Sequence, residues 1–114
     1  PKESFPPILI GELNAVPESD EMRRLTGLGP AYVPGFVATD TWAQCGEGAG
    51  ETYSADNPYV VDSAWPNRRL DYVLTGWPRP RTKGNPISVE RFGIKPVDGV
   101  VASDHHGVVA MISA

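Results

Sequence analysis

Polar side chains stand beside three short apolar runs of this 114-residue chain, at residues 8–10, 72–74 and 108–112. These side chains belong to Glu12, Asn14, Asp71, Asp104 and His105. Carboxylates bind hard divalent cations such as Mg²⁺, and imidazole takes or gives a proton near neutral pH because its pKa lies there. The residue types are those from which an active site could be built.

The apolar runs are the elements that must bring these side chains together. Unbroken apolar runs of this length are typical of strands that are covered on both faces. The polar residues follow the first run, whereas they precede the other two. If the first strand runs antiparallel to the second and third, all five polar side chains lie at one edge of the sheet. The pattern therefore predicts an active site at a sheet edge.

Weaker patterns predict further elements between these runs. A strand is expected at about 87–94 and another near 52–55. A helix is expected at about 18–26, because acidic residues lie in its first turn and Gly27 is placed to end it.

A second short helix or turn is expected near 39–44. Two segments read as loops, residues 44–51 for their glycines and residues 78–86 for their three prolines. Strands outnumber helices in this reading, which predicts an α+β or layered α/β fold.

Composition and charge exclude several classes of protein. The chain is 40% hydrophobic and 21% charged, ordinary values for one globular domain. Its net charge of −4 excludes a strongly basic nucleic-acid binder, although five basic residues at 68–83 could meet phosphate groups. The single Cys45 excludes an intrachain disulfide, and we assign it no catalytic role. No apolar run approaches the roughly 20 residues of a membrane span.

Three motifs resemble those of a known superfamily. Gly-Glu-Leu-Asn at 11–14 resembles a Gly-Asp-Phe-Asn element, and Arg-Leu-Asp-Tyr at 69–72 resembles an Arg-Ile-Asp-Tyr element. Ser-Asp-His at 103–105, followed by Val108, resembles a closing Ser-Asp-His-x-x-Val element. Their order is similar to that in the endonuclease/exonuclease/phosphatase (deoxyribonuclease-I-like) superfamily of metal-dependent phosphohydrolases. The resemblance extends from about residue 8 to residue 112.

The resemblance implies a fold and a partner. The chain would be half of a four-layer α/β sandwich, with one mostly antiparallel sheet and flanking helices, and residues 1–114 would form a single domain. The N-terminal half, which supplies the principal metal-binding Glu, would be absent. The apolar sheet face would then pack on that missing half or on a second copy of the chain, because large apolar patches favour association.

The resemblance also implies catalytic roles. His105 would act as general base on the attacking water or stabilise the charge on phosphorus. Asp71 would hydrogen-bond His105 and fix its tautomer. Asn14 would donate a hydrogen bond to a phosphoryl oxygen, and Arg69 would contact the substrate.

Metal binding is implied for two acids. Asp104 and Glu12 would bind Mg²⁺ or Mn²⁺, which offsets the negative charge that builds up on phosphorus. Glu12 stands where the superfamily usually has Asp, and its side chain is one methylene longer. Misplacement on that scale can cost about a hundredfold in rate, so Glu12 is the departure that bears most on activity.

Simpler structural interpretations stand beside these roles. Asp71 could cap a turn or pair with Arg68 or Arg69, and Asn14 could be a turn former, since Asn tolerates left-handed backbone. Adjacent residues in an extended segment point to opposite sides. Only one of the two histidines should therefore face the site, and we expect His105 there and His106 at the surface or as a gate.

Aromatic and turn residues complete the expectations. Trp42 is expected in the core, Asp40 as a helix cap, and residues 56–59 as a turn. Trp65 and Trp77 flank the basic segment and could stack on a substrate, but packing in the protein is the expectation for both.

Three functions remain open from the sequence. The first is metal-dependent hydrolysis of a phosphodiester or phosphomonoester, incomplete in this chain, with nucleic acid, phospholipid or inositol phosphate as the substrate. The second is a non-catalytic interaction or structural fragment derived from such a hydrolase. The third is a metal-binding module without hydrolytic activity.

Overall fold

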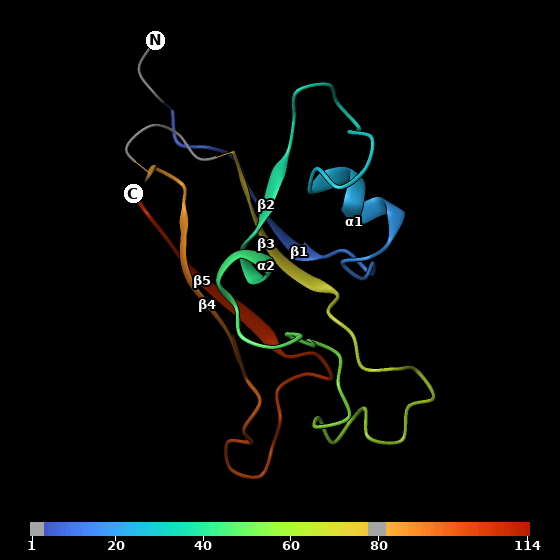
Figure 1. The fold of residues 1–114 in the computed structure, drawn as a ribbon. Helices are drawn as coiled ribbons and strands as arrows, with labels where there is room; N and C mark the ends of the chain where they lie inside the picture. The colour runs from blue at the N-terminus through green and yellow to red at the C-terminus, as the bar shows by residue number, and fades with distance from the viewer. Residues whose placement is uncertain (1–3, 78–81) are drawn as a thin grey trace.

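The computed structural model describes residues 4–77 and 82–114 of the chain. These residues form five strands and two short helices (Figure 1). In chain order the elements are β1 (Ile8–Glu12), α1 (Asp20–Leu25), β2 (Ala38–Asp40), α2 (Thr41–Cys45), β3 (Asp71–Gly76), β4 (Pro86–Phe92) and β5 (Gly107–Ile112). The mixture of antiparallel sheets and short helices confirms the predicted α+β class.

Strand β3 is the centre of a three-stranded sheet with the order β1-β3-β2. Both neighbours are antiparallel to β3, and β1 pairs Ile8 with Thr75 and Glu12 with Asp71. From Tyr72 onward β3 is buried, as expected for an apolar strand covered on both faces. The antiparallel direction predicted for β1 is confirmed, and it sets Glu12 directly opposite Asp71.

Strands β4 and β5 form a second, two-stranded antiparallel sheet. Its ladder pairs Phe92 with Gly107 and Pro86 with Ile112. Strand β5 contacts β3, and α2 contacts both β3 and β4. The prediction of one sheet is therefore wrong for the described residues, because β1 and β2 occupy both hydrogen-bonding edges of β3 and leave none for β5.

Helix α1 confirms the helix predicted at about 18–26, although it is shorter. Ser19 begins it by accepting a hydrogen bond from the Met22 main-chain N–H at 3.3 Å. The Thr26 hydroxyl ends it by donating to the Met22 carbonyl oxygen at 2.9 Å. Met22 is fully buried, so one side of this short helix faces the core.

The segment at 39–44 divides between β2 and α2. The Asp40 carboxylate accepts a hydrogen bond from the Trp42 main-chain N–H at 3.1 Å, which confirms the predicted cap. Trp42 is buried, which confirms its predicted place in the core. Strand β2 was not predicted, because three residues are too few to show a periodic pattern.

Three of the weaker predictions change in the structure. The strand expected near 52–55 is reduced to one bridge, between Tyr53 and Arg68. The loop expected at 44–51 begins later, because α2 extends to Cys45. Of the loop expected at 78–86, residues 78–81 lie outside the described residues and Pro86 already belongs to β4.

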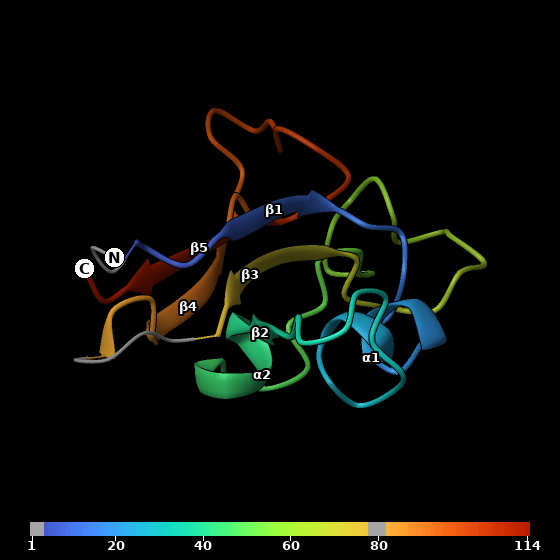
Figure 2. The same ribbon diagram turned by 90° about the horizontal axis from the view of Figure 1, so that it is seen from above.

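The core lies under β3, whereas β1 is exposed. Met22, Ala38, Tyr72 and Leu74 form the buried cluster, and Leu13, Ala15 and Leu25 pack against it. Figure 2 shows β1 on one side of the molecule and both helices on the other. Ile8, Leu9 and Ile10 of β1 are 45%, 47% and 69% exposed. The prediction that this run is covered on both faces is therefore wrong for the described part of the chain.

Leu74→Ala should lower the free energy of unfolding by about 2–5 kcal/mol, because it leaves a cavity in the core beside Met22 and Tyr72. Urea denaturation followed by circular dichroism measures this loss. Leu28→Ala is the matched control, since Leu28 is 64% exposed and its removal should change stability by less than about 0.5 kcal/mol. Equal losses in the two variants would contradict the assignment of the core.

Candidate functional site

A hydrogen-bonded histidine and aspartate form the centre of the candidate site. The Nδ1 atom of His105 lies 2.7 Å from Oδ2 of Asp71. Asp71 is the first residue of β3, and His105 lies two residues before β5. Because β5 contacts β3, the two sheets meet where these side chains face each other. An Nδ1–H bond to the carboxylate leaves Nε2 of His105 as the proton acceptor.

Glu12 completes a group of three ligand-bearing side chains. Its Oε1 lies 4.0 Å from Nε2 of His105. One ligand atom from each of Glu12, Asp71 and His105 lies within 4.8 Å of the others. The cause is the register of β1 on β3, which pairs Glu12 with Asp71 at the end of the ladder.

The surroundings of His105 raise its pKa above the ordinary value of 6.5. Burial by itself would lower the pKa of this imidazole, since it disfavours the charged form. The hydrogen bond to Asp71 and the negative charges of Asp71, Glu12 and Asp104 outweigh that effect. The imidazole is thus a stronger base than a free histidine.

Asn14 and Asp104 lie near His105 but outside the three-residue group. Asn14 lines a recess of about 290 Å³ that His105 also lines. Its backbone has a φ of 51°, so Asn14 is also the left-handed turn residue of the simpler interpretation. Asp104 is exposed, and the Ser103 hydroxyl donates to its Oδ1 at 3.4 Å. Of the two predicted metal ligands, only Glu12 belongs to the group.

Arg69 does not lie where a substrate contact requires it. The residue is only 7% exposed, and its guanidinium donates to Oδ2 of Asp40 at 2.7 Å. A substrate contact by Arg69 would have to break this buried ion pair, which is costly. The neighbouring Arg68 lines the recess beside His105 and stacks on the Trp65 ring at 4.6 Å. Of the two arginines, Arg68 is therefore the one that lines the recess beside His105.

His106 is buried, so the prediction that it lies at the surface or as a gate is wrong. Its Nε2 lies 2.8 Å from Oδ1 of Asp56, which belongs to the turn predicted at 56–59. This hydrogen bond is the main cause that lowers the pKa of Asp56. The two histidines have different partners, since His105 pairs with Asp71 at the site and His106 pairs with Asp56.

Thr52 is a residue of the site that sequence reasoning missed. It is fully buried, and its hydroxyl oxygen accepts hydrogen bonds from the main-chain N–H groups of Leu70 and Asp71 at 3.0 and 3.2 Å. Its carbonyl oxygen accepts one from the His106 N–H at 2.7 Å. Thr52 thus ties the start of β3 to the chain around His105. No pattern in the sequence marks it, since a lone Thr in a weak strand is ordinary.

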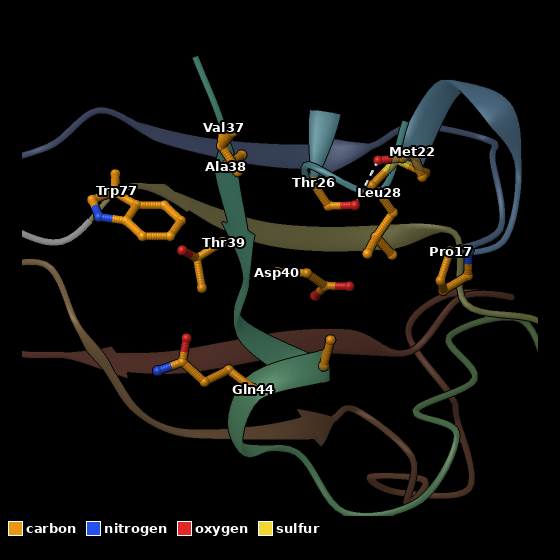
Figure 3. A pocket seen from close by; sticks show the side chains of 11 residues that line it. Pro17, Met22, Thr26, Leu28, Val37, Ala38, Thr39, Asp40, Gln44 and Trp77 are labelled. Atoms are coloured by element: carbon orange, nitrogen blue, oxygen red, sulfur yellow. Dashed lines mark hydrogen bonds between the residues drawn. The ribbon is translucent and has the colours of Figure 1, made fainter. Parts of the chain in front are cut away.

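An apolar pocket of about 560 Å³ lies elsewhere on the molecule. Figure 3 shows Trp77 on one side of β2 and Met22 on the other, with Gln44 of α2 below. None of Glu12, Asp71 and His105 lines it.

Trp77 and Trp65 are 67% and 66% exposed, so the expectation that both pack in the protein is wrong.

Comparison of the chain with protein-family models, with curated proteins and with solved structures finds no match. In the described part of the chain, neither helix has the length and apolar character that crossing a membrane requires.

Asp71→Asn should lower the pKa of His105, because it removes the charge that most favours the imidazolium. NMR titration of the His105 ring measures this pKa. Because the folded protein favours protonated His105, the Asp71–His105 pair stabilises the fold fully below pH 6.5, and this contribution is lost as the pH rises through the pKa of the folded state. The variant should therefore lose most stability at acidic pH. Asp98→Asn, which changes an exposed acid that is not among the charges acting on His105, should leave the titration unchanged. An unaltered pKa in Asp71→Asn would contradict the pairing.

Proposed function

We propose that this chain contributes the general base and part of the cation site of a metal-dependent phosphoester hydrolase. The observation that carries the proposal is the His105–Asp71 hydrogen bond of 2.7 Å with Glu12 facing the other ring nitrogen. Two acids and an imidazole converge at one sheet edge, and all three belong to motifs that resemble those of known phosphohydrolases.

His105 would take a proton from the attacking water through Nε2. Asp71 holds Nδ1–H, so it fixes the tautomer and supports the positive charge that the ring acquires. The raised pKa of His105 increases its strength as a base, while neutral imidazole remains the reactive form. Activity should therefore increase as the pH rises through this pKa.

The donor set suits a hard divalent cation. Mg²⁺ keeps several waters and is commonly held by one or two carboxylates, and Glu12 presents a half-exposed carboxylate at the site. Asp104, also exposed and close enough to raise the pKa of His105, would be the second oxygen ligand. A bound cation would offset the negative charge that develops on phosphorus.

Substrate contacts would come from the recess beside His105. Asn14 lines it and would donate its amide N–H to a phosphoryl oxygen. Arg68 lines the same recess and would supply a positive charge to the substrate, whereas the charge of Arg69 is paired with Asp40. Nucleic acid, phospholipid and inositol phosphate all present the anionic oxygens that these groups would bind.

His105→Ala should lower the turnover of bis(4-nitrophenyl) phosphate in Mg²⁺ or Mn²⁺ by about 10²–10⁴-fold, because it removes the general base. Absorbance of released nitrophenolate measures turnover, and titration calorimetry measures cation binding. Val97→Ala, an exposed substitution in the loop before β5, is the control and should keep full turnover. Cation binding without turnover in the wild-type protein would instead indicate a metal-binding module. The absence of both cation binding and turnover would indicate a non-catalytic fragment.

The exposed face of β1 belongs to the same proposal. Ile8, Leu9 and Ile10 are apolar side chains on both faces of one strand, which is typical of strands that are covered on both sides. The N-terminal half of such a hydrolase, or a second copy of this chain, would cover them.

If a second copy covers β1, Ile10→Lys should convert a dimer into a monomer, since it places a charge in the apolar contact. Light scattering coupled to size-exclusion chromatography measures the mass. Val97→Lys is the control, because Val97 is 74% exposed and lies outside β1. A wild-type protein that is monomeric at all concentrations would exclude the second copy and leave the N-terminal half as the expected partner.

A further inference from the structure

The two adjacent histidines form two separate histidine–acid pairs. His105 pairs with Asp71 at 2.7 Å, and His106 pairs with Asp56 at 2.8 Å. The His106 side chain is fully buried, whereas the His105 side chain is 20% exposed. The proposed reaction uses the first pair and leaves the second without a role.

The acid of the second pair is itself held in place. Arg91 on β4 lies 3.6 Å from Oδ2 of Asp56, and its guanidinium also donates to the Glu51 carbonyl oxygen at 2.8 Å. Asp56 therefore links the buried His106 imidazole to Arg91 of β4, and Arg91 in turn binds the main chain at Glu51. An acid that served only to keep the protein in solution would not need these partners.

Main-chain and side-chain bonds fix the same segment. The His106 N–H donates to the Thr52 carbonyl oxygen at 2.7 Å. The buried Asn57, next to Asp56, donates from its amide to the Ser103 carbonyl oxygen at 2.8 Å. The loop at 54–62 is thus hydrogen-bonded to the chain on both sides of His105, at Ser103 and at His106.

We propose that His106 and Asp56 are positioning residues that aim the His105 ring at Asp71. His105 and His106 share one peptide bond, so anchoring the side chain and the main chain of His106 restricts the backbone that carries the His105 ring. The long connection at 93–106 that carries His105 contains only one bridge of its own, between Val97 and Val100. The buried His106 pair adds a side-chain restraint directly beside His105. The inference rests on the proposed role of His105 as the base.

The test is the tautomer of His105, read from the ¹⁵N shifts of its two ring nitrogens at a pH where the ring is neutral. The wild-type protein should hold the Nδ1–H form, because Asp71 accepts that proton. Asp56→Ala should shift His105 toward the Nε2–H form that free histidine prefers. The Asp56 side chain is 45% exposed, so its removal leaves no core cavity, and thermal unfolding checks that the variant is folded.

Two variants separate positioning from a general loss of structure. Asp56→Asn keeps an oxygen that accepts the His106 hydrogen bond and should restore the wild-type tautomer. Asp62→Ala removes an exposed acid from the same loop and should change nothing. A His105 that keeps its Nδ1–H form in Asp56→Ala, or that fails to recover it in Asp56→Asn, would overturn the inference.

The tautomer is measured without turnover or metal, so this test and that of the proposed function can fail separately. A shifted tautomer in a protein that hydrolyses nothing would support the positioning role and remove the catalytic one. An unshifted tautomer in an active enzyme would do the reverse.

Discussion

The hydrogen bond between His105 and Asp71 joins two parts of the molecule that share no strand pairing. Asp71 begins β3 in the three-stranded sheet, and His105 precedes β5 in the two-stranded sheet. Hydrogen bonds with a charged partner are shorter and stronger than neutral ones, and this one measures 2.7 Å. This hydrogen bond forms only because β5 packs against β3. It also holds the His105 ring next to Glu12, the third member of the site.

Strand β3 serves both the core and the site. Its apolar residues, among them Tyr72 and Leu74, are buried in the central cluster, while its first residue is the partly buried Asp71. A carboxylate at the end of a rigid central strand has few ways to move, which suits a group that must hold an imidazole in one orientation. The Thr52 hydroxyl adds to this rigidity because it accepts the N–H of Asp71 at 3.2 Å.

The register of β1 on β3 decides where the longer side chain of Glu12 reaches. The antiparallel pairing sets Glu12 opposite Asp71, so its longer side chain extends past the strand end toward Nε2 of His105. An aspartate at this position would stop one methylene short. The longer reach leaves the carboxylate half-exposed and 4.0 Å from the ring, close enough to act on its charge without a direct hydrogen bond.

The sequence by itself determined the features that depend on neighbouring residues: the apolar strands β1, β3 and β5, the helix at Ser19 and the Asp40 cap. It predicted neither the division into two sheets nor the exposure of β1. The burial of His106 and the Asp40 partner of Arg69 were also decided only by the tertiary structure. The Arg69–Asp40 and His106–Asp56 bonds join residues that are 29 and 50 positions apart. Local patterns carry no information on which distant group a side chain meets, and that choice is made only when the strands pack.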